Sequence, residues 1–178
     1  MPTVRVRMNG LCDPYQPLDG RYGLTRRCLQ TLIREGWLLT VLTRSGLVLR
    51  DRDLLGAEAG AEVGFSIPTA DDGVRRWFEP SAPPIPERIR ALGELHGAGI
   101  RTYVMIAPLL PGAEGLMDLL VGSVDQVLVD RMNYRAADSL YARHGLEAYR
   151  SGEYLSRAGG AIRDECCRWG IPCRILFR

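Results

Sequence analysis

The chain has 178 residues, of which 46% are hydrophobic and 25% are charged. This balance suits one globular domain with a sizeable core and speaks against a disordered chain, a collagen-like fibre or a small disulfide-stapled scaffold. The 23 basic and 21 acidic residues leave a formal net charge of +2, too even for the electrostatic signature of a dedicated nucleic-acid binder.

The residue types present exclude several chemistries. No lysine occurs, so a Schiff base, an amine nucleophile and a Walker lysine are all ruled out. His96 and His144 are the only histidines, which rules out a three-histidine metal site. The five cysteines include no CxxC pair, and their odd number suits reduced thiols in the cytoplasm. We therefore predict no metal site within this chain.

The N-terminal sequence MPTVRVRMNG lacks the pattern of a signal peptide, and no apolar run is long enough to span a bilayer. We expect a soluble cytoplasmic protein without membrane contact. Short apolar runs then alternate with amphipathic stretches, which is typical of repeated βα units. The first unit has a strand over residues 3–8 and a helix over 22–35. Leu24, Cys28, Leu29 and Leu32 share one face of that helix, which places Cys28 in the core.

The next strands are predicted over residues 38–43 and 62–67. Asp51 and Asp71 follow these strands at positions where a carboxylate would cap a short helix. Further along, the pattern predicts helices over 85–98, 136–144 and 148–169 and strands over 101–107, 124–129 and 174–177. We see no linker or repeat, so residues 1–178 are expected to form a single domain.

The expected strands are nearly continuous in apolar residues, as in a parallel sheet that is buried on both faces. In such folds the chemistry gathers at the carboxyl ends of the strands. Polar residues and turn formers follow the strands at 9–17, 43–45, 65–67, 107–112 and 130–134. From the residues alone, the sequence predicts an α/β protein with a site at one rim of its sheet.

An ordered set of short motifs spans most of the chain. It comprises DPYQP at 13–17, LTRRCL at 24–29, LTRS at 42–45, LVLRD at 47–51, GFSI at 64–67, FEP at 78–80, PERI at 86–89, MIAPLLPG at 105–112, VDRMNY at 129–134 and GIPCRILF at 170–177. In this order the motifs resemble the radical SAM superfamily, and within it the spore photoproduct lyase-like branch. The resemblance implies a partial (βα) TIM-like barrel with a mostly parallel sheet.

That resemblance also implies two cofactors, a 4Fe–4S cluster held by a CxxxCxxC loop and S-adenosylmethionine, which yields a 5′-deoxyadenosyl radical. No CxxxCxxC occurs here, and the sequence begins at what corresponds to the second strand of the family. We therefore expect a truncated radical SAM core whose first βα unit is missing. A missing N-terminal segment or a complementing chain would supply the cluster ligands, and this chain alone is expected to be inactive.

The resemblance assigns cofactor-binding roles to three rim residues. Asp13 corresponds to a position that holds the methionine amino group, although an Asx turn before Pro14 explains it equally well. Arg44 corresponds to a position near the cofactor carboxylate that is often lysine, the alternative being a strand-end arginine in solvent. Ser66 corresponds to a polar position that contacts the ribose or the carboxylate.

Two further assignments concern the adenine and the hydrogen atom. Ala107 and Pro108 lie in a segment that resembles the adenine-packing segment of the family, and a proline-rich βα turn is the alternative. Cys12 lies near the position where photoproduct lyases keep a cysteine that returns a hydrogen atom to the product radical. It abuts Asp13 rather than preceding it by a few residues, so a small buried residue is the favoured interpretation.

The sequence therefore predicts part of a radical SAM lyase-like enzyme that abstracts hydrogen from a substrate it does not identify. Repair of a DNA photoproduct is one candidate reaction. The alternative is a non-catalytic α/β fragment that binds a nucleotide-like ligand or a partner chain.

Overall fold

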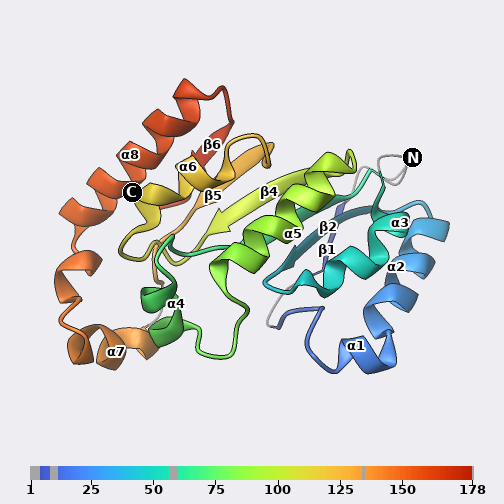
Figure 1. Cartoon of the computed structure of the whole chain (residues 1–178), viewed down its shortest axis with the longest axis horizontal. Helices are drawn as coiled ribbons and strands as arrows, with labels where there is room; N and C mark the ends of the chain where they lie inside the picture. Colours follow the sequence, from blue (N-terminus) through green and yellow to red (C-terminus); the bar gives the residue numbers. More distant parts are fainter. Residues whose placement is uncertain (1–4, 9–11, 57–59, 134, 178) are drawn as a thin grey trace.

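The computed structural model describes residues 5–8, 12–56, 60–133 and 135–177. Within these ranges, six strands pair in parallel in the order of the chain (Figure 1). They are β1 (Arg5–Met8), β2 (Leu38–Thr43), β3 (Glu62–Ser66), β4 (Arg101–Ile106), β5 (Gln126–Val129) and β6 (Cys173–Ile175). Each strand pairs only with its neighbours in sequence, so β1 and β6 are the edges of an open sheet. The α/β fold of a partial barrel is confirmed.

The helices between the strands cover the sheet from outside. They are α1 (Asp19–Tyr22), α2 (Leu24–Arg34), α3 (Arg52–Leu55), α4 (Asp72–Phe78), α5 (Ile85–Gly97), α6 (Leu116–Leu120), α7 (Asp138–Arg143) and α8 (Gly152–Arg168), with short 3-10 turns η1 (Gly46–Asp51), η3 (Ala113–Gly115), η4 (Arg135–Ala137) and η5 (Glu147–Arg150). Figure 1 shows α2, α3 and α5 on the same side of the sheet. Among the described residues, no helix combines the length and apolar character needed to cross a membrane.

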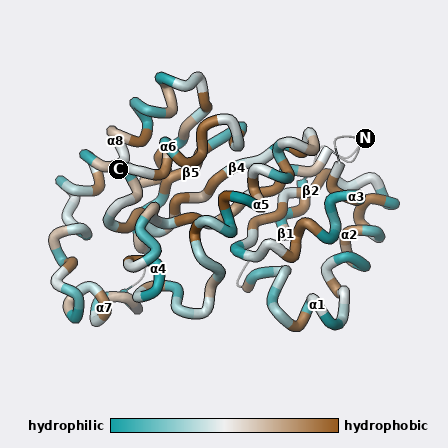
Figure 2. Tube along the Cα trace, viewed as in Figure 1, coloured by the Kyte–Doolittle hydropathy of each residue, from teal (hydrophilic) through white to brown (hydrophobic). Residues whose placement is uncertain are grey.

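The core lies between the strands and these helices. Successive strand residues point to opposite faces of a sheet, and Val41, Val63 and Val104 of three neighbouring strands are all fully buried. Figure 2 shows hydrophobic residues running along β4 and β5. The edge strand β1 differs, because its alternate residues Arg5 and Arg7 are exposed. Only the middle of the sheet is therefore buried on both faces.

On the opposite face, Tyr103 fills the space above Gly64. The two residues are register partners on β3 and β4, and a Cβ atom at position 64 would lie 2.2 Å from the Tyr103 ring. The Tyr103 hydroxyl donates a 3.2 Å hydrogen bond to the Val41 carbonyl, and the residue is buried. Glycine is required at position 64 so that this aromatic ring can close the inner face of the sheet.

The predicted helix over 22–35 differs from the structure in its buried face. Gly23 has a positive φ of 60° and separates α1 from α2. The buried residues of α2 are Thr25 and Leu29, whereas Cys28 is exposed, so the prediction that Cys28 lies in the core is wrong. Thr25 is fixed by a backbone hydrogen bond of 2.8 Å to the Asp19 carboxylate, and this anchor rotates the apolar stripe by about one residue.

The two predicted helix caps have different outcomes. Asp71 accepts hydrogen bonds from the amides of Gly73 and Val74 and caps α4, as predicted. Asp51 precedes α3 but makes no capping hydrogen bond with its side chain. Its carboxylate is instead fully buried in a network of polar side chains, so the capping role predicted for Asp51 is wrong.

Candidate functional site

The loop after β1 is tied to the end of β2 by Asp13. One carboxylate oxygen accepts hydrogen bonds from the Tyr15 amide (2.9 Å) and the Thr43 hydroxyl (2.6 Å), and the other accepts from the Arg44 amide (2.7 Å). The bond to Tyr15 confirms the Asx turn. A carboxylate offers about four acceptor sites, so Asp13 keeps one for a further donor while it holds two strand ends together.

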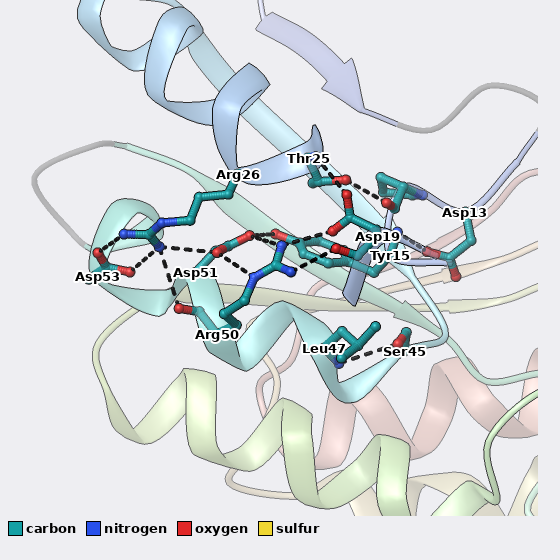
Figure 3. A network of polar contacts seen from close by, with 11 residues as sticks. Asp13, Tyr15, Asp19, Thr25, Arg26, Ser45, Leu47, Arg50, Asp51 and Asp53 are labelled. Atoms are coloured by element: carbon teal, nitrogen blue, oxygen red, sulfur yellow. Dashed lines mark hydrogen bonds and ion pairs between the residues drawn. The ribbon is translucent and has the colours of Figure 1, made fainter. Parts of the chain in front are cut away.

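A network of polar side chains connects this loop to η1 and α2 (Figure 3). The Tyr15 hydroxyl donates to Asp51 at 3.1 Å, and Arg50 donates to both Asp51 (3.0 Å) and Asp19 (2.8 Å). Arg26 reaches Asp51 from α2 at 3.1 Å. Burial, followed by the charge of Asp51, raises the pKa of Tyr15 above its ordinary value, so its hydroxyl stays a donor. The network stabilises the rim loop against η1 and α2.

Arg44 leaves the end of β2 and turns toward the loop between α4 and α5. Its Nε lies 2.5 Å from Oε1 of Glu79, whose side chain is only 11% exposed. The Nη atoms of Arg44 make no hydrogen bond within the described part of the chain. The ion pair with Glu79 therefore fixes the Arg44 side chain, while its two Nη groups form an open edge that is free to bind a ligand. The alternative interpretation was a strand-end arginine in solvent.

Ser66 ends β3 and is buried. Its carbonyl accepts a 2.8 Å hydrogen bond from Nη1 of Arg88, and the same Nη1 lies 2.7 Å from Oε2 of Glu79. Arg88 is fully buried on α5. A chain of polar contacts therefore connects Ser66 to Arg44 through two residues that the sequence analysis did not select.

A signal for Arg88 was present in the sequence. Arg88 lies three residues after Ile85 and four before Leu92, both of which are fully buried, so it occupies the apolar face of a predicted helix. A charged residue at such a position needs polar partners. Glu79 belongs to the FEP motif at 78–80, but the sequence assigned it no role, because it lies outside the periodic pattern of the predicted helices.

Ala107 and Pro108 follow β4 at the same rim. Their peptide bond is cis, and both residues are half-buried. The next amide, of Leu109, donates a 2.8 Å hydrogen bond to the Asp130 carbonyl after β5. Backbone hydrogen bonds thus join the segments that follow β4 and β5, and this end of the rim is separate from the group around Arg44.

Cys12 is exposed, so its interpretation as a small buried residue is wrong. The loop has turned its side chain toward solvent because the apolar anchor of the segment is Tyr15, which is 1% exposed. Exposure leaves the Cys12 thiol accessible to solvent.

Between the rim loops lies a hollow of about 460 Å³, called here the rim hollow. It is lined by Asp13, Tyr15, Gln16, Pro17, Arg44, Ser45 and residues 78–83. Its volume is within the usual range for small-molecule sites. Of the predicted site residues, the structure brings Asp13 and Arg44 together at this hollow, whereas Cys12, Ser66, Ala107 and Pro108 do not line it.

The two implied cofactors fit these residues differently. The rim hollow offers an open guanidinium edge, one spare carboxylate acceptor and apolar walls, a set that suits the charged tail of S-adenosylmethionine. A 4Fe–4S cluster needs several thiolates together. In the described ranges, no three His, Cys, Asp or Glu side chains are grouped to hold a metal, so these residues do not fit the cluster.

Sequence comparisons find relatives that are described as uncharacterized proteins. No family model matches the chain. An uncharacterized protein of Methanocaldococcus jannaschii is 35% identical over 107 residues, covering 60% of this chain and 41% of that protein. One from Mycobacterium bovis is 34% identical over 113 residues, covering 61% of this chain and 32% of that protein. The matched region therefore spans less than half the length of these relatives.

Structural comparisons identify the fold. Spore photoproduct lyase complexed with dinucleoside spore photoproduct superposes with a TM-score of 0.66 at 15% identity, covering 97% of this chain and 60% of that one. Streptococcus suis SuiB bound to S-adenosylmethionine superposes with a TM-score of 0.68 at 12% identity, covering 97% and 39%. Both are radical SAM enzymes. The chain has a radical SAM-like fold that corresponds to part of their length.

Proposed function

We propose that this chain forms the S-adenosylmethionine-binding rim of a radical SAM enzyme. The observation that carries the proposal is the rim hollow at the carboxyl ends of β1 and β2, which is lined by both Arg44, with its open edge, and Asp13, with its spare acceptor site. Binding at strand ends is the rule for α/β folds of this kind.

The five residues that were predicted to bind the cofactor each have a role in holding it. Arg44 binds the methionine carboxylate through its two Nη groups, and Asp13 accepts a hydrogen bond from the methionine amino group. Ser66 contacts the ribose or the carboxylate. Ala107 and Pro108 offer backbone groups and an apolar surface to the adenine. Together these residues fix the cofactor along the rim.

S-adenosylmethionine supplies, in enzymes of this class, a 5′-deoxyadenosyl radical that abstracts a hydrogen atom from substrate. In our proposal, a segment outside the described residues provides the 4Fe–4S ligands. A photoproduct in DNA is one candidate substrate, supported by the shared fold with spore photoproduct lyase. With such a substrate, the exposed Cys12 thiol is the candidate hydrogen-atom donor.

The free edge of β1 favours the binding of a further segment or chain. Outside its pairing with β2, β1 has no neighbouring strand among the described residues, and such an edge is a template for another strand. Nearby, α1 and the start of α2 expose Tyr22 and Leu24, each 55% accessible. We propose that a further segment or a complementing chain covers this edge.

A second candidate function is non-catalytic binding of a nucleotide-like ligand or a partner chain. It is favoured by one observation, the lack of a grouped set of metal ligands within the described ranges. One experiment distinguishes the two candidate functions. The chain is fused to a segment of a relative that carries CxxxCxxC, and the fusion is supplied with S-adenosylmethionine, iron, sulfide and reductant. Production of 5′-deoxyadenosine supports the enzyme, whereas its absence from a fusion that holds the cluster supports the binding module.

Calorimetric titration of the chain with S-adenosylmethionine tests the proposed site itself. We expect saturable binding that weakens at least about tenfold in Arg44→Met, because a carboxylate loses its charged partner. Arg34→Met is the matched control, since Arg34 is an exposed residue of α2 that pairs with Glu35. Absence of binding, or equal binding by both variants, would contradict the assignment.

A further inference from the structure

Arg88 is the most deeply buried cation described in this chain, with no exposed side-chain surface. Its Nε donates to the Pro83 carbonyl at 2.9 Å and its Nη1 to the Ser66 carbonyl at 2.8 Å. Its Nη2 is buried and has no hydrogen-bond partner within the described residues. Burial lowers the pKa of this guanidinium, and the charge of Glu79 opposes that shift. A buried arginine of this kind is costly, so its position calls for a role.

Glu79 is shared between two arginines. Oε2 lies 2.7 Å from Nη1 of Arg88, and Oε1 lies 2.5 Å from Nε of Arg44. Because Glu79 occupies Nε, the bidentate edge of Arg44 formed by Nη1 and Nη2 is left for a ligand. Arg44 and Glu79 both line the rim hollow.

We propose that Arg88 and Glu79 are positioning residues, which hold the Arg44 guanidinium so that its open edge grips the ligand carboxylate. Arg88 also donates to the carbonyl of Ser66, the residue expected to contact the ribose or the carboxylate, so one buried cation contacts both Glu79 and Ser66. The inference rests on the proposed function, because it takes the ligand to be S-adenosylmethionine.

The charges of these residues determine whether the loss of Glu79 strengthens or weakens carboxylate binding. Arg44, Arg88 and Glu79 together carry a net charge of +1, which favours an anion, and Asp13, which also lines the hollow, adds one negative charge for the amino group of the ligand. The charge of Glu79 is compensated by Arg88 at 2.7 Å, so it does not repel a carboxylate bound to the far edge of Arg44. Removing the charge of Glu79 is therefore expected to weaken carboxylate binding, because Arg44 loses its fixed orientation.

Two soluble probes isolate the carboxylate contact. S-adenosylhomocysteine carries the amino-acid tail, whereas 5′-methylthioadenosine has the same thioether nucleoside without it. Calorimetric titration of the whole chain with each probe gives a ratio of affinities. In Glu79→Gln and Arg88→Lys we expect S-adenosylhomocysteine to lose about tenfold in affinity and 5′-methylthioadenosine to change less than about twofold.

Arg90→Lys is the matched control. Arg90 lies on the same helix as Arg88, but it is exposed, pairs with Glu94 and does not line the rim hollow. We expect this variant to keep the affinity ratio. Glu79→Gln provides the test if Arg88→Lys does not fold.

Three results would overturn the positioning role. An unchanged ratio in Glu79→Gln, with wild type preferring S-adenosylhomocysteine, refutes the inference and leaves the proposed function standing. Tighter S-adenosylhomocysteine binding by Glu79→Gln makes Glu79 a competitor of the carboxylate rather than its support. Failure of wild type to bind either probe refutes the proposed function and the inference together.

Discussion

The Tyr15 hydroxyl donates a 3.1 Å hydrogen bond to the Asp51 carboxylate, 36 positions away, in a place that water does not reach. This contact joins the loop after β1 to η1, the turn after β2. It forms at the base of the rim hollow, whose lining includes Tyr15. The shape of the candidate site thus depends on a carboxylate that does not itself line the hollow.

Asp51→Asn is expected to destabilise the chain by about 2 kcal/mol, because Tyr15 and Arg50 lose a charged acceptor in a buried place. Denaturant unfolding followed by circular dichroism measures this change in the free energy of unfolding. Asp53→Asn is the matched control, because Asp53 pairs with Arg26 at the exposed end of the same network. Equal losses in the two variants would show that burial of Asp51 contributes nothing.

Acid should destabilise the fold through carboxylates that are held ionised. Hydrogen bonds from Arg75 lower the pKa of Asp72 well below its usual range, and those from Arg26 lower the pKa of Asp53 to about 2. Groups with a depressed folded pKa bind protons more readily in the unfolded chain, so their stabilisation is present above about pH 4 and is lost as pH falls toward the folded values.

We therefore expect the free energy of unfolding to fall below about pH 4, with a shallower fall in Asp72→Asn. Chemical denaturation at a series of pH values measures the slope. Asp118→Asn on α6 is the control, because Asp118 has no ion pair in the part of the chain that the structure describes. An acid limb in Asp72→Asn as steep as in wild type would contradict the assignment.

Gly64→Ala is expected to cost about 3 kcal/mol or to prevent folding, because the new methyl group would overlap the Tyr103 ring. Adding Tyr103→Ala should recover part of the stability that Gly64→Ala removes. The effects of the two substitutions on stability are then not additive, which thermal melts of the single and double variants measure. Gly160→Ala on α8 has open space around it and is expected to stabilise by about 0.5–1 kcal/mol. A harmless Gly64→Ala would mean that Tyr103 can leave the inner face of the sheet.

Anaerobic reconstitution of this chain with iron and sulfide is expected to yield no stoichiometric 4Fe–4S cluster. Cys12, Cys28 and Cys167 are exposed, and although the Cys166 and Cys173 thiols contact each other, no three metal-ligating side chains are grouped within the described residues. Iron and sulfide analysis with absorbance spectroscopy measures the content. A stoichiometric brown chromophore that disappears when Cys166, Cys167 or Cys173 is replaced would contradict this expectation.

Much of the fold follows from local pattern. The apolar run over residues 38–43 and the proline and glycine signals around 85–98 lie in segments where periodicity and strand propensity agree with the final packing. The sequence therefore predicts β2 with its exact bounds and α5 within one residue.

The features that the sequence did not predict, among them the exposure of Cys28 and the burial of Asp51, depend on contacts between distant segments. The rotation of α2 that exposes Cys28 depends on Asp19 binding Thr25, and the burial of Asp51 depends on Tyr15 and Arg50. Of the site, Asp13 and Arg44 could be selected from their rim positions, but Glu79 could not, because a loop glutamate acquires a role only when two arginines fold onto it.

Hydrogen exchange of the chain with and without S-adenosylmethionine, resolved by mass spectrometry, tests the proposed binding rim most directly. Binding at the rim predicts slower exchange in residues 13–17, 43–45 and 78–83, which surround the rim hollow, and in 107–110 after β4. Protection confined to the hollow lined by Ala148, Glu153 and Arg157, which shares no residue with these segments, or no protection at saturating ligand, would contradict it.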